Sequence, residues 1–339
     1  MQLRFIFLLG FFVVGKLLVA QTDTLSTISN TFSFSDVDEK PVKRYCTQKV
    51  LNQTPNRFIS IGYEYQGAYD FQASPTTRNE TLRFNNAKGL RLGLFTPIVS
   101  KNNLIINLAA NYWQTDYDGP NYTFPYPLYQ SLNNNGLNSA GLSATIFKPL
   151  NEKKFLLFQV IADANWQSQS GGSITVDAAM TYSASAIYGF KPTENLMWGL
   201  GVSRTYRLGR PIIIPVLLYN QTFNEKWGIE SVFPAKVAVR RNINKKSMLF
   251  AGYELEGNQY ALNNVNLRTT FLQRGEIKTK LTYERSLFGF WWLSIQTGLR
   301  VNGRFNVVDE YNGRKTNQVV TSTLGNAFFF NVSLNLVSL

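Results

Sequence analysis

From residue 57 onward, the feature that most constrains the fold is a period of two in hydrophobicity. In the segment 59–66, two Ile and two Tyr alternate with Ser, Gly, Glu and Gln. The same alternation recurs at 90–94, 104–112, 156–166, 196–203, 291–302 and 328–336. A period of two is typical of a β-strand with one apolar and one polar face, and not of a helix.

The lengths of these segments and the residues on their polar face favour a membrane barrel over a soluble sandwich. Several approach the ~9–11 residues of a tilted transmembrane strand, whereas sandwich strands are nearer ~5–6 residues. Gly, Ser, Asn and Gln dominate the polar face, and charged residues make up only 16% of the chain, with 14% aromatic. The sequence therefore predicts an all-β fold, an antiparallel up-and-down transmembrane β-barrel.

The spacing of the connections predicts fourteen strands. Short polar turns are expected at 100–102, 151–153, 192–194, 223–225, 244–246 and 287–289, and longer loops at 72–86, 117–137, 168–178, 257–273 and 306–324. Barrels of the outer membrane have short periplasmic turns and longer outer loops. The segments 227–232 and 236–243 are short and flank Pro234, which breaks a ladder hydrogen bond. If these two do not span, the count is twelve.

The N-terminus predicts export. Residues 1–20 combine Arg4, an apolar stretch from Phe5 to Val14 and a small residue, Ala20, before the expected cleavage point. Lys16 interrupts the apolar run before it reaches the ~20 residues of a spanning helix. We therefore expect a signal peptide at 1–20, an irregular periplasmic segment at 21–56, and a barrel at 57–339. The expected location is the outer membrane of a Gram-negative bacterium, with its lipid and its barrel-assembly machinery as partners.

The composition argues against catalysis, metals and nucleic acid. The chain has no His, which removes His-based triads and most zinc sites, and it has one cysteine, Cys46. We find no nucleophile elbow and no metal-ligand spacing, so we expect no catalytic residues, no metal and no cofactor. The formal net charge is +13, but the basic residues are scattered among strands rather than clustered as in nucleic-acid-binding proteins.

Further features make the sequence resemble the uncharacterised outer-membrane β-barrel families known as domains of unknown function. They are the leader, Trp227-Gly-Ile-Glu230, Phe233-Pro234, Ala251-Gly-Tyr-Glu254 with Tyr260, and the alternation from 328 to 336. The resemblance covers about residues 57–339 and implies a barrel in the outer membrane, with no known activity or site. One departure is the C-terminus, which ends in Leu339 where such barrels usually end in an aromatic residue that serves the assembly machinery.

Several charged residues have the phase that faces away from lipid, where a Lys or Arg at mid-depth would cost roughly 2–4 kcal/mol. We predict that they form a charge network in the lumen, consisting of Glu230, Arg240, Glu254, Lys278, Lys280, Glu284 and Arg300. Two functions follow. One is a passive channel or transport barrel for small polar solutes, with a lumen that selects by charge. The other is a plugged structural or surface-interaction barrel, in which the paired charges fill the lumen and nothing is transported.

Aromatic residues are expected at two kinds of place. The loop 116–138 is unusually rich in Tyr and Pro, so we expect it to be ordered and to form a constriction or a binding surface, through Tyr117, Tyr122, Phe124, Tyr126 and Tyr129. The six tryptophans stand near strand ends, where they are expected to supply the girdles at the membrane interfaces: Trp113, Trp166, Trp198, Trp227, Trp291 and Trp292.

Overall fold

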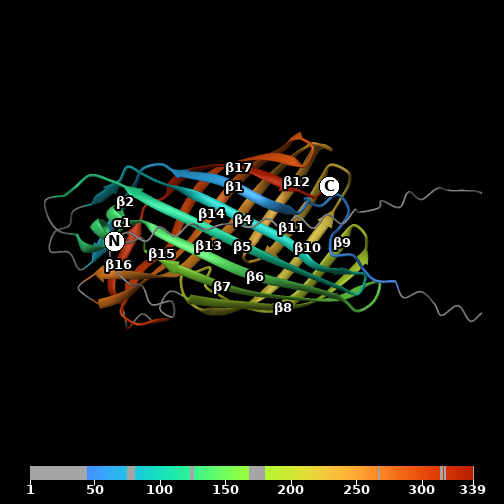
Figure 1. Cartoon of the computed structure of the whole chain (residues 1–339), viewed down its shortest axis with the longest axis horizontal. Helices are drawn as coiled ribbons and strands as arrows, with labels where there is room; N and C mark the ends of the chain where they lie inside the picture. The colour runs from blue at the N-terminus through green and yellow to red at the C-terminus, as the bar shows by residue number, and fades with distance from the viewer. Residues whose placement is uncertain are drawn as a thin grey trace, which may run out of the picture. The chain divides into compact units, whose positions relative to one another are not determined.

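The computed structural model describes residues 44–74, 81–122, 126–167, 180–265, 268–313, 316 and 318–338. The expected signal peptide, the outer loop at 168–178 and Phe124 lie outside these residues, in whole or in large part. Within them, no helix combines the length and hydropathy needed to cross a membrane. The unit that begins at Lys43 is almost entirely β-structure (Figure 1).

The strands and the single described helix follow one another along the chain. In the first half they are β1 (Arg57–Gln66), β2 (Tyr69–Ser74), β3 (Leu82–Phe84), β4 (Asn86–Lys101), β5 (Leu104–Asp118), α1 (Pro127–Asn135), β6 (Leu137–Pro149) and β7 (Lys154–Trp166). In the second half they are β8 (Met180–Thr193), β9 (Leu196–Thr205), β10 (Ile212–Thr222), β11 (Trp227–Phe233), β12 (Lys236–Asn244), β13 (Ser247–Val265), β14 (Arg268–Phe288), β15 (Trp291–Val308), β16 (Gln318–Leu324) and β17 (Ala327–Val337).

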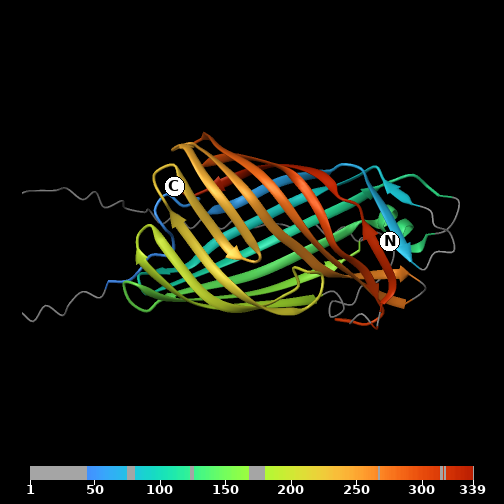
Figure 2. The ribbon, with the colours of Figure 1, turned by 180° about the vertical axis from the view of Figure 1, so that it is seen from behind.

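Fourteen of these strands close into a barrel. Each is antiparallel to its neighbours, in the order β1, β4 to β15, and β17, and β17 returns to β1 (Figures 1 and 2). The weak strands β11 and β12 are members of this ring, with six paired positions between them. The prediction of fourteen strands is therefore confirmed, and twelve is excluded. Closure leaves no unpaired strand edge around the wall, as a membrane-spanning sheet requires.

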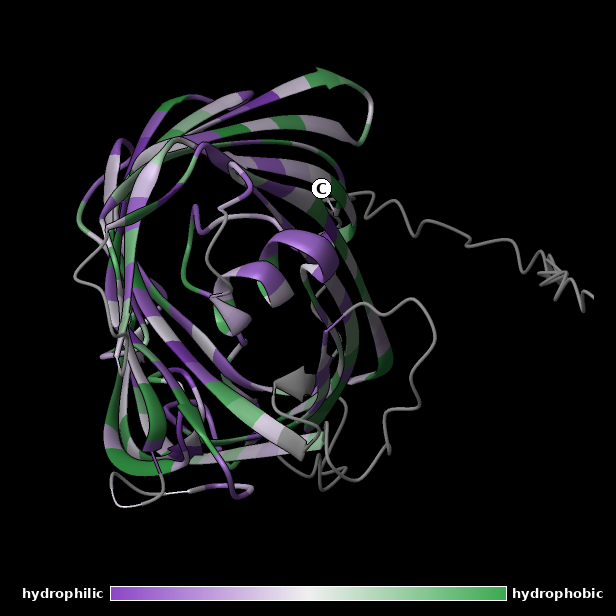
Figure 3. Ribbon diagram, turned by 90° about the vertical axis from the view of Figure 1, so that its left-hand side faces the viewer, coloured by the Kyte–Doolittle hydropathy of each residue, from purple (hydrophilic) through white to green (hydrophobic). Residues whose placement is uncertain are grey.

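The two faces of the wall follow the period of two seen in the sequence. Large apolar side chains point outward and are exposed, including Ile61, Leu142, Val160 and Leu299, each at least 51% exposed. Their neighbours along the strands, such as Glu64 and Arg300, point inward and are buried. The hydropathy colouring alternates along the ribbons accordingly (Figure 3). An apolar exterior of this extent cannot be stable in water, so the ring spans a lipid bilayer.

At the end of the barrel that carries the long connections, the loop end, the wall is narrower. The bridge between Ala261 of β13 and Trp166 of β7 is parallel and skips β8 to β12. Together with the pairings of β16 with β2 and of β2 with β3, it closes a second, nine-membered ring: β2, β3 continuing into β4, β5, β6, β7, β13, β14, β15 and β16. The predicted loop at 257–273 is wrong, because β13 and β14 continue through it to build this ring.

A hydrophobic core fills the smaller ring. It contains side chains from eight of its nine members, and helix α1 adds Leu128, Tyr129 and Leu132. The helix lies inside the circle of strands in the end-on view (Figure 3). Its first residue, Pro127, has the fixed backbone angle suited to a helix start, and it ends at Gly136, which has a φ of 63°. The predicted loop at 117–137 therefore ends in a helix, and the axial path through the loop end is filled by packed side chains.

At the opposite end, which carries the short turns, the irregular segment 44–56 folds against the inside of the wall. Cys46 and Val50 are buried in a cluster with Phe147, Phe155 and Met197, among others. Backbone hydrogen bonds tie the segment to the adjoining turns, for example from the N–H of Leu51 to the carbonyl of Glu194, at 3.0 Å. This inner segment covers part of the turn end.

The tryptophans do not all form a girdle. Trp113 lines an internal cavity and lies 4.8 Å from the guanidinium of Arg91, and Trp292 is 4% exposed on the inward face. Their prediction as interface residues is wrong, because a period of two places them on the lumen side of β5 and β15. Trp227, which is 42% exposed, does point outward.

Candidate functional site

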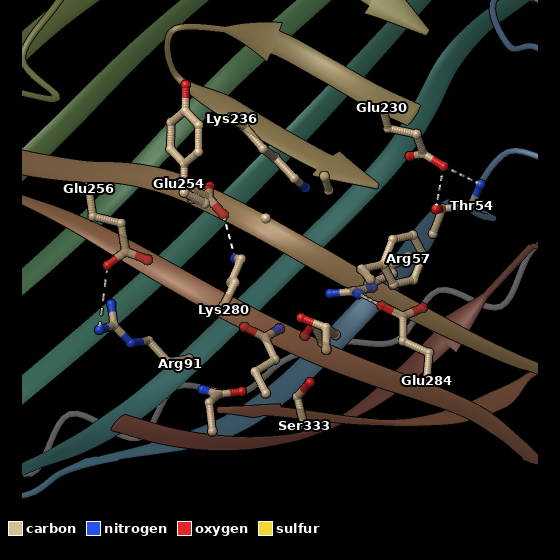
Figure 4. A pocket seen from close by; sticks show the side chains of 18 of the residues that line it. Thr54, Arg57, Arg91, Glu230, Lys236, Glu254, Glu256, Lys280, Glu284 and Ser333 are labelled. Carbon is tan, nitrogen blue, oxygen red and sulfur yellow. Dashed lines mark hydrogen bonds and ion pairs between the residues drawn. The ribbon is translucent and has the colours of Figure 1, made fainter. Parts of the chain in front are cut away.

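The hydrophobic core that fills the smaller ring at the loop end is called the aromatic core. Between it and the inner segment at the turn end lies a cavity of about 520 Å³. Its wall comes mainly from the inward faces of β1, β4, β12, β13, β14, β15 and β17, and the inner segment contributes Thr54 and Pro55. Polar and charged side chains dominate its lining, and Figure 4 shows them converging from several strands. This cavity is the candidate functional site.

Two ion pairs stand at the turn end of the cavity. Nη1 of Arg240 lies 2.8 Å from Oε1 of Glu230, and the hydroxyl of Thr54 donates to the same oxygen at 2.8 Å. Arg57 pairs with Glu284 (Figure 4). Glu230 and Glu284 thereby anchor the inner segment and the start of β1 to the wall. A charge buried this deeply needs such a partner, since an uncompensated one costs several kcal/mol.

A denser cluster separates the cavity from the aromatic core, and Lys278 stands at its centre. Its ammonium lies 2.8 Å from Glu64, 2.7 Å from Glu256 and 3.7 Å from Glu276. Arg91 contacts two of these carboxylates, Glu64 at 2.8 Å and Glu256 at 3.9 Å. The ammonium of Lys278 therefore contacts carboxylates from three strands: β1, β13 and β14.

The same cluster continues toward the core through Glu276. Its carboxylate accepts from Arg274 at 3.0 Å and lies 3.7 Å from Arg300. Arg300 also donates to the carbonyl of Gly325, at 2.9 Å, and its guanidinium lies 4.4 Å from the ring of Tyr69. All of these groups are almost fully buried. The cluster therefore links the polar lumen to the aromatic core.

A third group of charges surrounds Glu254 on the opposite side of the cavity. One carboxylate oxygen lies 2.6 Å from Lys280 and the other 3.8 Å from Arg207. Lys236 is paired directly with Glu254 in the β12–β13 ladder. Its ammonium ends in the cavity, where it attracts the Glu254 carboxylate but makes no hydrogen bond or close ion pair (Figure 4). Among the described residues that line the cavity, it is the one cation with no hydrogen bond or ion pair.

Lys236 and Glu254 also line a second cavity, of about 170 Å³, so the two spaces meet there. This side pocket lies between the inward faces of β7 to β10 and the tight β11–β12 turn. Apart from Arg207 and Gln159, its lining is a mixture of aliphatic side chains and hydroxyls: Ile161, Ile214, Val216, Val232, Pro234, Ser183, Ser185, Ser203 and Thr205. The lining of the side pocket thus carries fewer charges than that of the large cavity, and the meeting point at Lys236 is called the neck.

The seven charged residues singled out from the sequence all lie on the inward face, but in separate groups. Glu230 with Arg240, Glu254 with Lys280, and Lys278 with Arg300 belong to the three groups above, and Glu284 joins Arg57. Sequence reasoning found seven charged residues of the lumen and missed eight others: Arg57, Glu64, Arg91, Arg207, Lys236, Glu256, Arg274 and Glu276. Glu64 and Arg91 carried a usable signal, since each has the same phase as the glycines on its strand.

The aromatic residues of the loop 116–138 lie in or against the aromatic core and not in the charged cavity. Tyr117, Tyr126 and Tyr129 are buried in the aromatic core, and Tyr122 packs against it. The hydroxyl of Tyr129 donates to the carbonyls of Arg83 and Pro120, at 3.1 and 3.0 Å. These four side chains hold the loop end closed.

The inner segment carries a titratable group of its own. Lys49 donates to the carbonyl of Thr54 at 2.7 Å, and burial lowers its pKa to about 8, although the carboxylate of Glu230 acts in the opposite direction. In the described part of the chain, no three residues of the types His, Cys, Asp and Glu are grouped as metal ligands would be. The arrangement is therefore suited to binding and selecting charged solutes by electrostatic contact.

The closed ring, its apolar exterior and its charged interior define a transmembrane β-barrel with a central cavity. The chain belongs to the family described as domain of unknown function DUF6268, whose model matches residues 48–337. Membership of an uncharacterised barrel family, inferred from the sequence, is confirmed. Comparison with curated proteins finds no match.

The chain is also similar to several solved structures, at low sequence identity and with TM-scores below 0.5. An outer membrane channel from Pseudomonas putida F1 is 11% identical, with a TM-score of 0.39, over 89% of this chain and 100% of that one. A FadL homologue from Pseudomonas aeruginosa is 10% identical, with a TM-score of 0.41, over 83% and 91%. The Pseudomonas putida toluene transporter TodX is 6% identical, with a TM-score of 0.35, over 84% and 90%.

Proposed function

We propose that this protein is a passive transport barrel of the outer membrane, exported by its N-terminal leader, which admits small solutes to the lumen. The observation that carries the proposal is the cavity of about 520 Å³, lined by charged and polar side chains and joined to a side pocket at the neck. A barrel that served only as a scaffold would gain stability from an apolar filling, since buried ion pairs contribute little net stability.

The route through the lumen is not a straight pore. The aromatic core occupies the loop end of the axis, and the inner segment covers part of the turn end. The solute is therefore expected to be small and to reach the cavity past side chains that move, so the flux is slower than through an open porin. Charge at the cavity wall selects among solutes, as in other pores lined by ionised side chains.

The experiment is solute entry into liposomes that contain the refolded mature chain, measured by swelling in arabinose and by single-channel conductance. We expect slow sugar entry and small conductance steps. The substitution Val50→Asp places a charge among Phe147, Phe155 and Met197, which displaces the inner segment, and it should increase both signals. The exposed Leu51, substituted as Leu51→Asp, is the matched control.

A structural barrel is the second candidate, and the filling of both ends favours it. The aromatic core contains eighteen buried residues, more than a transport path along the axis would tolerate. If neither the wild-type chain nor the Val50→Asp variant admits arabinose or conducts ions, while both show heat-modifiable folding, the transport proposal is wrong and the structural role stands.

A further inference from the structure

We propose that the neck binds a small organic anion, whose acid group contacts Lys236 and whose short hydrocarbon part lies in the side pocket. This inference rests on the proposed function, because it names the class of solute that the cavity admits. Its two halves come from different observations: one is the charge balance around Glu254, and the other is the lining of the side pocket.

At the neck, the cations outnumber the carboxylates by one. Three cations surround Glu254, namely Lys280, Arg207 and Lys236. The two oxygens of the carboxylate already face Lys280 and Arg207, at 2.6 and 3.8 Å. The other carboxylate near Arg207 is Asp163 of β7. Three cations thus face two carboxylates. Lys236 attracts the carboxylate of Glu254, but of the three cations it is the one with no hydrogen bond or ion pair within 4.0 Å.

Every other ionised group that lines the large cavity has a partner in the structure. Its lining carboxylates Glu64, Glu230, Glu254, Glu256 and Glu284 each contact a cation. A cationic solute would therefore have to displace an existing ion pair, and so would an anion at any other lysine or arginine. An anion that reaches Lys236 displaces only water and can accept a charge-assisted hydrogen bond from its ammonium, while Lys280 and Arg207 offset the negative charge of nearby Glu254.

The side pocket explains why the anion should carry a hydrocarbon part. From the neck, the pocket continues along Val232, Pro234, Val216, Ile214 and Ile161, with hydroxyls, an amide and, as its one other cation, Arg207. Placing CH₂ groups against these aliphatic side chains removes them from water, which favours binding. Its volume of about 170 Å³ is below the ~300 Å³ of pockets for drug-sized ligands, so the hydrocarbon part is short.

The test uses the full mature chain in lipid nanodiscs and three probes: hexanoate, hexanol with the same chain but no charge, and acetate with the charge but no chain. Binding is measured by calorimetry. We expect hexanoate to bind at least about tenfold more tightly than either of the other two, since it alone fills both halves of the site. Equal affinity for hexanoate and hexanol would overturn the anion site, and equal affinity for hexanoate and acetate would overturn the role of the side pocket.

Variants separate the two halves of the site. Lys236→Gln should weaken hexanoate binding about tenfold and leave hexanol unchanged, and Lys236→Arg should keep most of the affinity. Lys245→Gln, in the exposed β12–β13 turn, is the matched control and should have no effect. Val232→Trp fills the side pocket and should weaken hexanoate but not acetate. Heat-modifiable migration shows for each variant that the barrel has folded.

The outcomes distinguish this inference from the proposed function. If the wild-type chain admits arabinose into liposomes but Lys236→Gln binds hexanoate within twofold of wild type, the anion site is wrong and the transport barrel stands. If hexanoate binds as expected but no solute enters liposomes, the site is a binding site of a closed barrel and the transport proposal is wrong.

Discussion

Ala261 of β13 forms a parallel bridge with Trp166 of β7, although β8 to β12 separate these two strands in the wall of the barrel. The carbonyl of Ala261 also accepts a hydrogen bond from the N–H of Gln167, at 3.1 Å. This contact converts a ring of fourteen strands at mid-depth into a ring of nine at the loop end. The smaller ring is narrow enough for side chains to fill it, as an eight-stranded barrel is. One barrel therefore holds both the aromatic core, in the smaller ring, and the cavity, in the wider one.

The first prediction concerns this bridge. Ala261 is 0% exposed and packs against Phe271, Val308 and Trp166, so Ala261→Phe should push β13 away from β7 and open the loop end. We expect larger single-channel conductance with the fourteen-stranded ring intact. Ala251→Phe is the matched control, because Ala251 lies on the outward face of the same strand and is exposed. Equal conductance of the two variants would show that the bridge does not limit passage.

The second prediction concerns the hub of the ion network. Lys278→Met removes the cation that contacts Glu64, Glu256 and Glu276. Because Arg91 still contacts Glu64 and Glu256, and Arg274 still contacts Glu276, the free energy of unfolding should fall by less than the roughly 3–5 kcal/mol expected for a wholly uncompensated buried charge, but by more than for an exposed pair. Equilibrium unfolding in urea from liposomes measures the change. Arg83→Met is the control, because the Arg83–Asp70 pair is about 60% exposed on both sides and should contribute less than about 1 kcal/mol.

The third prediction concerns the aromatic core. Tyr129 is 1% exposed, and its ring stacks on Phe84 at a centroid distance of 4.6 Å. Tyr129→Ala should cost roughly 3–5 kcal/mol of stability through the cavity it leaves. Tyr129→Phe removes only the hydroxyl that donates to Arg83 and Pro120 and should cost about 1 kcal/mol. Similar losses for the two variants, measured by thermal unfolding, would contradict the packing role of the ring.

Much of this barrel could be predicted from the sequence because the wall follows local rules. The alternation at 59–66 fixed which side of β1 faces lipid, and the count of turns fixed the number of strands. Period and phase also placed charges such as Lys278 inside. These features depend only on the order of residues within one strand and its adjoining turns.

The parts that could not be predicted depend on contacts between distant strands. Residues 257–273 look like a loop because Gly257 and the Asn, Gln and Thr residues of this stretch interrupt the apolar pattern. In the structure, Gly257 and Gly275 admit the β9–β10 turn, since a Cβ on Gly275 would lie 2.7 Å from the carbonyl carbon of Leu208. Likewise, nothing local indicates that Lys236 stays unpaired while Glu254 binds Lys280, since that depends on which strands meet across the neck.

The last prediction concerns the inner segment and pH. In the docked segment the pKa of Lys49 is about 8, below the ordinary 10.5, because burial disfavours the charged amine. In the window between those two values, the released segment binds more protons than the docked one, so docking becomes more favourable as pH rises. The gain is at most about 1.4 kcal/mol per pH unit, and less because half-buried Lys49 keeps some contact with water.

The measurement is hydrogen exchange of the peptide 44–56, corrected for the intrinsic rate at each pH, in the refolded mature chain at pH 7 and pH 9.5. We expect stronger protection at pH 9.5, since the segment then no longer buries a charge. Lys49→Met should give the same protection at both values, and Lys245→Met should behave as wild type. Protection that falls on going to pH 9.5 would mean that the attraction between the Lys49 ammonium and the charge of Glu230, and not the burial of the amine, controls the docking of the segment.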